Sequence, residues 1–149
     1  MRTLSNFDID NMFKGRKQYL GCYARNAIPR SIWQKRGFMV INQDNAHGPG
    51  THWVYLRLGP TNAYVDSFGM APAEEVVRGL KSTGRKCHFS NIQIQDKNSN
   101  SCGWFATMLG FENCIKNRPL EDILCDDMGY NPKMCEYQLT KYFAQKGLH

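Results

Sequence analysis

The chain has 149 residues, which is enough for one domain with a single core, and we expect one domain spanning residues 1–149. Its 19 Lys and Arg against 13 Asp and Glu leave a net charge of +6, so acidic partners such as nucleic acid are candidates. A hydrophobic content of 42% excludes a disordered chain, and no apolar run is long enough to cross a membrane.

The first half of the chain begins with a helix signal. Ser5 and Asp8 form the pattern of a capping box, which predicts a short helix that runs to about Phe13. An apolar run over 37–42 has the length and composition of a strand. The Gly- and Pro-containing segment 45–50 then indicates a loop.

A β-hairpin is predicted next. Residues 52–58 alternate as a strand requires, and a second short strand over 63–66 follows the turn at 59–62. One side of the first strand carries His52, Val54, Leu56 and Leu58, and the other carries Trp53, Tyr55 and Arg57.

The second half of the chain is richer in helix. A helix is expected from Pro72 to about Lys81, a short strand over 91–94, a buried helix from Cys102, and a terminal helix over 136–145. Helices and strands are grouped rather than strictly alternating. We therefore predict an α+β fold in which a small, mainly antiparallel sheet packs against the central helix that carries Cys102.

Cysteine usage favours a reducing compartment. The sequence does not open with a secretory signal, so we expect an intracellular, non-secreted protein whose cysteines are reduced and mostly buried. No Cys-x-x-C pair occurs and the four histidines are scattered, which argues against a metal site. The six cysteines are Cys22, Cys87, Cys102, Cys114, Cys125 and Cys135.

Cys102 has the sequence context of a nucleophile. A thiolate at the start of a helix is stabilised by the helix dipole, and Cys102 follows a polar loop at such a start. We expect Gly103 to let a substrate backbone approach. The alternative is an inert core cysteine at a helix end.

A catalytic cysteine needs an imidazole, and His52 is the best placed of the four histidines. It begins a strand, whereas His47 lies in a loop, His88 precedes a strand and His149 ends the sequence. Asp66 ends the adjoining strand, within reach of His52 in a paired register. The alternatives are a structural histidine and an aspartate that caps the following turn.

A side-chain amide before the cysteine could donate to an oxyanion. Gln95 precedes Cys102 by seven residues, at the end of the predicted strand. Gln93 is the same residue type on the same strand face, so spacing leaves both open.

Together these residues resemble a known family. The segments 51–53, 65–69 and 95–105 are similar to the His–acid–Gln–Cys order of adenain, the adenovirus maturation protease, and of its compact relatives in Maverick/Polinton-type DNA viruses. The wider group includes SUMO-specific and other ubiquitin-like proteases. Segment 19–23 also resembles the early part of adenain.

The resemblance implies a catalytic role for each of four residues. Cys102 would be the nucleophile, His52 the general base and acid, Asp66 the orienting acid and Gln95 the oxyanion donor, which decides against Gln93. Trp53 would shield the imidazolium, with Trp53 and Gly103 next to the substrate. The implied fold is a papain-like core with a rearranged order of catalytic residues.

The implied substrates are capsid and virion precursor proteins, cleaved at Gly-containing sites inside the virion or at the site of virus assembly. We expect a monomer that needs no metal or organic cofactor. Adenain has Glu at the position of Asp66 and a longer C-terminal region. Adenain also binds an activating peptide by a disulfide, but the spacing of Cys87 differs and we expect no peptide cofactor here.

Activation by viral DNA is the further expectation, because basic residues cluster in the N-terminal third and phosphate neutralisation needs no sequence code. The alternative is a solvated basic face. The candidate DNA-binding residues are Lys14, Arg16, Lys17, Arg25, Arg30, Lys35 and Arg36.

Two other functions compete with virion maturation. One is a deubiquitinase or deSUMOylase that uses the same chemistry on host conjugates. The other is a catalytically inactive, DNA-binding assembly module that keeps the fold.

Overall fold

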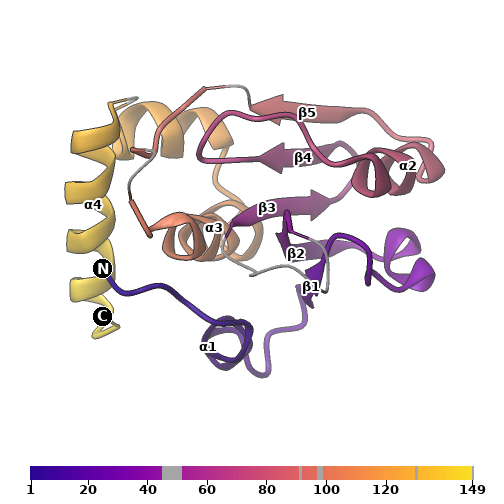
Figure 1. Cartoon of the computed structure of the whole chain (residues 1–149), viewed down its shortest axis with the longest axis horizontal. Helices are drawn as coiled ribbons and strands as arrows, with labels where there is room; N and C mark the ends of the chain where they lie inside the picture. Colours follow the sequence, from indigo (N-terminus) through magenta and orange to yellow (C-terminus); the bar gives the residue numbers. More distant parts are fainter. Residues whose placement is uncertain (45–51, 91, 97–98, 130, 149) are drawn as a thin grey trace.

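A five-stranded sheet is the central layer of the computed structural model, which describes residues 1–44, 52–90, 92–96, 99–129 and 131–148 (Figure 1). The strands follow one another across the sheet in chain order. They are β1 (Tyr19–Ala24), β2 (Gly37–Asn42), β3 (Trp53–Leu58), β4 (Asn62–Val65) and β5 (Cys87–Ser90). The helices are α1 (Asn6–Met12), η1 (Arg30–Gln34), α2 (Glu74–Ser82), α3 (Cys102–Leu109), η2 (Gly110–Ile115), η3 (Asp122–Asp127) and α4 (Pro132–Gln145).

The α+β prediction is confirmed, but the sheet is mixed rather than mainly antiparallel. The pairs β2–β3 and β3–β4 are antiparallel, whereas β1–β2 and β4–β5 are parallel. The two parallel pairs arise because η1 and α2 carry the chain back before the next strand starts, as a parallel connection requires.

Both faces of the sheet are covered, so the molecule has two apolar cores. On one face, side chains of β2 and β3 such as Phe38 and Tyr55 pack with α1, α3 and α4. On the other, Met39 and Leu56 from the same strands pack with η1 and α2. The predicted alternation of 52–58 is confirmed, although both of its faces are buried.

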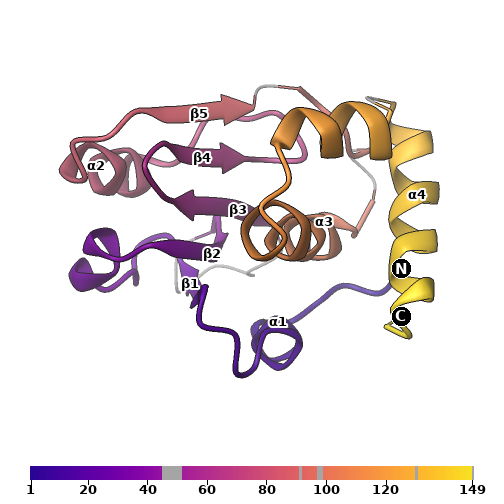
Figure 2. The ribbon, with the colours of Figure 1, turned by 180° about the vertical axis from the view of Figure 1, so that it is seen from behind.

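The central helix α3 lies against the face that Figure 2 shows in front, and all eight of its residues are buried. Trp104 packs edge-to-face on Phe143 of α4, with ring centroids 4.8 Å apart. The predicted buried helix at Cys102 is therefore confirmed. No helix in the described ranges is both long enough and apolar enough to cross a membrane.

Local signals placed most element ends correctly. The capping box at Ser5 and Asp8 is present, with Asp8 N–H donating to Ser5 Oγ at 3.2 Å. The terminal helix starts earlier than expected, because Asn131 caps it and Pro132 occupies its first turn. The strand expected over 91–94 is wrong: β5 ends at Ser90, residues 92–94 are not strand, and Asn91 lies outside the described residues.

Candidate active site

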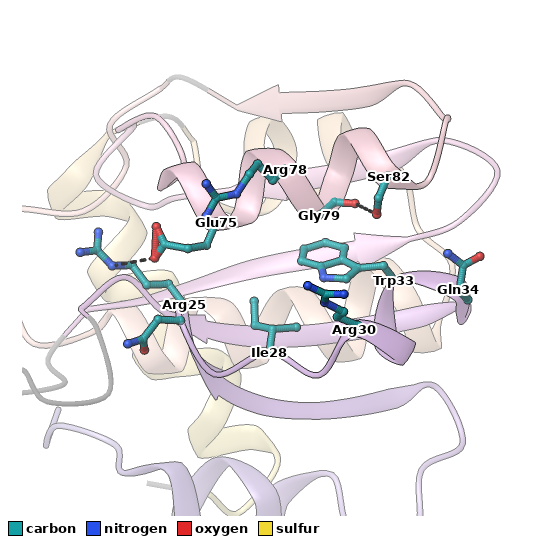
Figure 3. Close-up of a pocket in the computed structure, with 10 residues that line it drawn as sticks. Arg25, Ile28, Arg30, Trp33, Gln34, Glu75, Arg78, Gly79 and Ser82 are labelled. Carbon is teal, nitrogen blue, oxygen red and sulfur yellow. Dashed lines mark hydrogen bonds and ion pairs between the residues drawn. The ribbon is translucent and has the colours of Figure 1, made fainter.

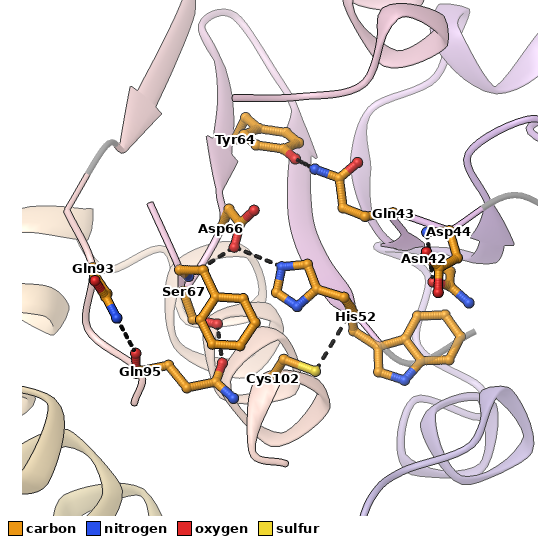
Figure 4. Close-up of polar contacts among 12 residues, drawn as sticks. Asn42, Gln43, Asp44, His52, Tyr64, Asp66, Ser67, Gln93, Gln95 and Cys102 are labelled. Atoms are coloured by element: carbon orange, nitrogen blue, oxygen red, sulfur yellow. Dashed lines mark hydrogen bonds and ion pairs between the residues drawn. The ribbon is translucent and has the colours of Figure 1, made fainter. Parts of the chain in front are cut away.

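Three element ends that are far apart in sequence meet at one end of the sheet (Figure 4). His52 directly precedes β3, Asp66 directly follows β4, and Cys102 is the first residue of α3. Because β3 and β4 are antiparallel, the start of one strand lies beside the end of the other. This topology brings His52 to Asp66, and the packing of α3 on β3 adds Cys102.

Asp66 orients the imidazole of His52. Its Oδ1 lies 2.8 Å from His52 Nε2 and also accepts a hydrogen bond of 2.8 Å from Phe68 N–H. The carboxylate is fully buried. It therefore fills both roles weighed from the sequence, since it caps the turn and holds the Nε2–H tautomer of His52.

The other imidazole nitrogen, Nδ1, is buried and lies on the side of the ring towards Cys102 in Figure 4. Burial lowers the pKa of His52, but the hydrogen bond with Asp66 and the electrostatic effect of Asp66 and the nearby Cys102 outweigh it and raise the pKa to about 9. Cys102 Sγ also accepts a hydrogen bond of 3.4 Å from Trp53 N–H. The sulfur therefore lies beside an imidazole whose pKa is raised to about 9.

Gln95, and not Gln93, is built into this cluster. Gln95 is 2% exposed, whereas Gln93 is exposed and donates to the Gln95 carbonyl at 3.1 Å. The Gln95 amide is held at both ends, because its Oε1 accepts from Ser67 Oγ and its Nε2 donates to Ser99 O at 3.0 Å. Its nitrogen is thereby oriented as a donor beside the cysteine loop.

Trp53 and Gly103 make packing contacts in the fold, and their expected contacts with substrate stay a prediction. Trp53 is buried and its indole N–H donates to Leu4 O at 2.9 Å. A Cβ at Gly103 would lie 3.0 Å from both Leu4 and Trp53, so the missing side chain lets the start of α3 pack closely on these two residues. Phe68 stacks on the imidazole of His52, with ring centroids 4.5 Å apart.

None of the other histidines and cysteines that the structure describes belongs to the cluster of His52, Asp66 and Cys102. His88 lies within β5, not before it, and is exposed. His47 and His149 lie outside the described residues. None of the six cysteines, all of which the structure describes, forms a disulfide; only Cys102 and Cys135 are buried, so most are not fully buried packing residues.

The remaining cysteines differ in reactivity. Burial raises the pKa of Cys22 to about 12 and that of Cys87 to about 11, which keeps these thiols protonated. Cys125 is exposed. A thiol reagent must therefore be tested against Cys125 as well as Cys102.

Among the residues that the structure describes, no group of three His, Cys, Asp or Glu side chains could hold a metal ion.

The seven basic residues proposed for DNA are separated in space. Lys14, Arg16 and Lys17 precede β1, and Lys35 and Arg36 precede β2, whose start pairs with the start of β1. Arg25 follows the far end of β1, contacts Glu75 at 3.5 Å and shares with Arg30 a cavity of about 580 Å³ between η1 and α2 (Figure 3). The sequence cluster is thus a group of five and a separate pair.

Comparison with protein-family models and with curated proteins gives no match. Among solved structures, the chain is similar to the ASFV pS273R protease, with a TM-score of 0.61 and 16% identity. The match covers 92% of this chain and 66% of that protease. The SUMO protease Ulp1 aligns with a TM-score of 0.49 and 15% identity, over 93% of this chain and 80% of Ulp1. The chain therefore has the α+β fold of the ASFV pS273R protease, with Cys102 on its central helix.

Proposed function

We propose that the chain is a cysteine endopeptidase that cleaves virion precursor proteins at Gly-containing sites. The observation that carries the proposal is the geometry of three side chains: Asp66 holds His52 Nε2 at 2.8 Å, while His52 Nδ1 lies towards Cys102 at the start of α3. The fold shared with a viral protease supports the same activity. The choice of virion precursors rests on the resemblance to adenain in the segments around these residues.

Acylation begins when Cys102 Sγ attacks the carbonyl carbon of the scissile peptide bond. His52 Nδ1 holds the proton of the thiol and transfers it to the leaving amine as the C–N bond breaks. The Gln95 amide donates to the oxyanion of the tetrahedral intermediate. Asp66 keeps the imidazole in the productive tautomer and stabilises its positive charge.

Deacylation uses the same groups in reverse. A water molecule loses a proton to His52 Nδ1 and attacks the thioester carbonyl. The C–S bond then breaks, and His52 returns the proton to the Cys102 sulfur. The chain's own side chains complete this cycle, with water as the second substrate.

Two variants test the mechanism. Cys102→Ala removes the nucleophile and is expected to abolish cleavage of precursor peptides while the far-ultraviolet circular dichroism stays that of the wild type. Asp66→Asn keeps an acceptor for Phe68 N–H but lets the amide donate to His52 Nε2, which favours the wrong tautomer. We expect it to lower kcat by about 10³- to 10⁴-fold. Full activity in Cys102→Ala contradicts the proposal.

A substrate panel tests the specificity. Peptides that span Gly-containing sites of virion precursors are compared with ubiquitin and SUMO probes that carry a reactive C-terminus. Cleavage of the peptides and slow reaction with the probes are expected. The reverse order of rates would make the chain a processing enzyme for ubiquitin-like conjugates.

A further inference from the structure

A carboxylate of α4 accepts hydrogen bonds from the segment that leads into the candidate nucleophile. Glu136 Oε1 accepts a hydrogen bond of 2.5 Å from Ser101 Oγ, and Glu136 Oε2 accepts one of 3.0 Å from Ser99 Oγ. Ser99 Oγ in turn accepts from Ser101 N–H at 3.2 Å. Both carboxylate oxygens of Glu136 are therefore used on residues next to Cys102.

Ser101 does not act as an ordinary N-cap. It occupies the N-cap position of α3, where a serine hydroxyl usually accepts from a backbone N–H of the first turn. Here the hydroxyl makes no capping hydrogen bond and is directed to Glu136 instead. Ser101 is 1% exposed, so the serine end of this contact is buried, while Glu136 is half-buried.

The same segment holds the oxyanion donor. Gln95 Nε2 donates to the carbonyl oxygen of Ser99, the residue whose hydroxyl Glu136 binds. Ser67 Oγ binds the other end of the amide. Moving Ser99 would therefore move the donor that the proposed mechanism places at the oxyanion.

The helix that carries Glu136 is capped at its start and packed along its length. Asn131 caps α4 by accepting from the N–H groups of Lys133 and Met134, and the apolar side of α4 packs on α3 through Phe143 and Trp104. Glu136 thus projects from a helix that is docked on the helix of the nucleophile.

We propose that Glu136 is a positioning residue for the oxyanion site: through Ser99 and Ser101 it fixes the Gln95 amide relative to Cys102. This role rests on the proposed peptidase function. Glu136 does not touch the reacting atoms, so its loss should slow the chemical step without weakening substrate binding.

The test compares Glu136→Gln, Ser101→Ala and the double variant, with Glu74→Gln as a matched control. Glu74 lies on α2, and its carboxylate pairs with Arg78 at 3.2 Å. Glu136→Gln keeps the size of the side chain but leaves one acceptor oxygen for two hydroxyl donors. We expect kcat to fall about tenfold with KM within about twofold, as for the loss of one charged hydrogen bond. The double variant should lose no more than about the larger single loss, because both changes break the same contact.

Two further readouts separate positioning from general destabilisation. Hydrogen exchange at the Ser101 amide should accelerate in Glu136→Gln and not in Glu74→Gln. Cys102 alkylation by iodoacetamide is measured in a Cys125→Ser background. Its rate should stay at the wild-type value, because the hydrogen bonds of Glu136 with Ser99 and Ser101 do not include the His52–Asp66 pair. A fall in alkylation that parallels the fall in kcat would overturn the inference in favour of a merely structural role.

Different experimental results would overturn the proposed function and the inference about Glu136. If the wild type is as inactive as Cys102→Ala on every substrate of the panel, the proposed function is wrong and this inference falls with it. If the wild type is active but Glu136→Gln leaves kcat and amide exchange unchanged, only the inference is overturned.

Discussion

At the scale of single residues, the site depends on how each polar side chain is held. Asp66 is fully buried and accepts from both His52 and Phe68 N–H, so its position is set by the turn as well as by the imidazole. Phe68 covers one face of that imidazole. These contacts restrict the ring to the orientation in which Nδ1 lies towards Cys102.

The raised pKa of His52 predicts a dependence of stability on pH. The pKa lies at about 9 in the folded chain and at 6.5 for an unperturbed histidine. A raised pKa means that the folded state binds the proton more tightly, so this contribution is complete below pH 6.5 and is lost as the pH rises through about 9.

We therefore expect the difference in Tm between the wild type and His52→Gln to be largest near about pH 6 and to shrink by about pH 10. Thermal unfolding followed by circular dichroism measures it. A difference that grows with pH would contradict the assignment. In the same range, peptidase activity should decline along an alkaline limb.

At the scale of elements, two close approaches at glycine pack helices against neighbouring elements. Gly103 lets the start of α3 lie against Leu4 and Trp53. On the opposite face, Gly79 of α2 lies against the indole of Trp33 in η1, and a Cβ at Gly79 would come within 2.0 Å of that ring. The second contact closes the core that is remote from the candidate site.

Gly79→Ala tests that contact. In an unobstructed helix the change would stabilise the chain, because alanine is the better helix former by about 1 kcal/mol. Here Trp33 must move, so we expect a loss of about 1–3 kcal/mol in the free energy of unfolding, measured with urea. Lys81→Ala, on an exposed position of the same helix, should change it by less than about 0.5 kcal/mol. A gain in stability for Gly79→Ala would show that the approach is looser than described.

At the scale of the whole molecule, the candidate active site and the group of five basic residues lie at different ends of the sheet. The end at His52 and Asp66 carries the candidate chemistry, while the starts of β1 and β2 follow five exposed basic residues. Arg25 and Arg30 line a cavity elsewhere, between η1 and α2. For the DNA binding that the sequence predicts, the group of five is the better phosphate-binding surface, because Arg25 of the other pair is already paired with Glu75.

The salt dependence of DNA binding distinguishes the two groups. The logarithm of the binding constant falls with the logarithm of salt concentration by about 0.9 for each phosphate neutralised. Replacing both Lys17 and Arg36 by alanine should therefore reduce the slope by about 1.8, whereas replacing Arg25 and Arg30 should leave it unchanged. Fluorescence anisotropy with duplex DNA measures both slopes. Binding that does not weaken as salt rises would contradict a phosphate contact.

The sequence by itself determined the features that depend on neighbours in the chain. The Ser5–Asp8 box, the alternation of residues 52–58 and the helix that starts at Cys102 follow from capping and from periods of two and 3.6 residues. The choice of Gln95 over Gln93 needed the family resemblance. No local pattern separated two glutamines on one presumed strand face.

Only the tertiary structure decided what depends on distant parts of the chain. It made the sheet mixed, placed Phe68 rather than Trp53 on the imidazole, and divided the basic residues into two groups. It also brought Glu136 to Ser101, a contact between residues 35 positions apart. Such contacts are set by how helices and strands dock on one another, and neither composition nor periodicity records that docking.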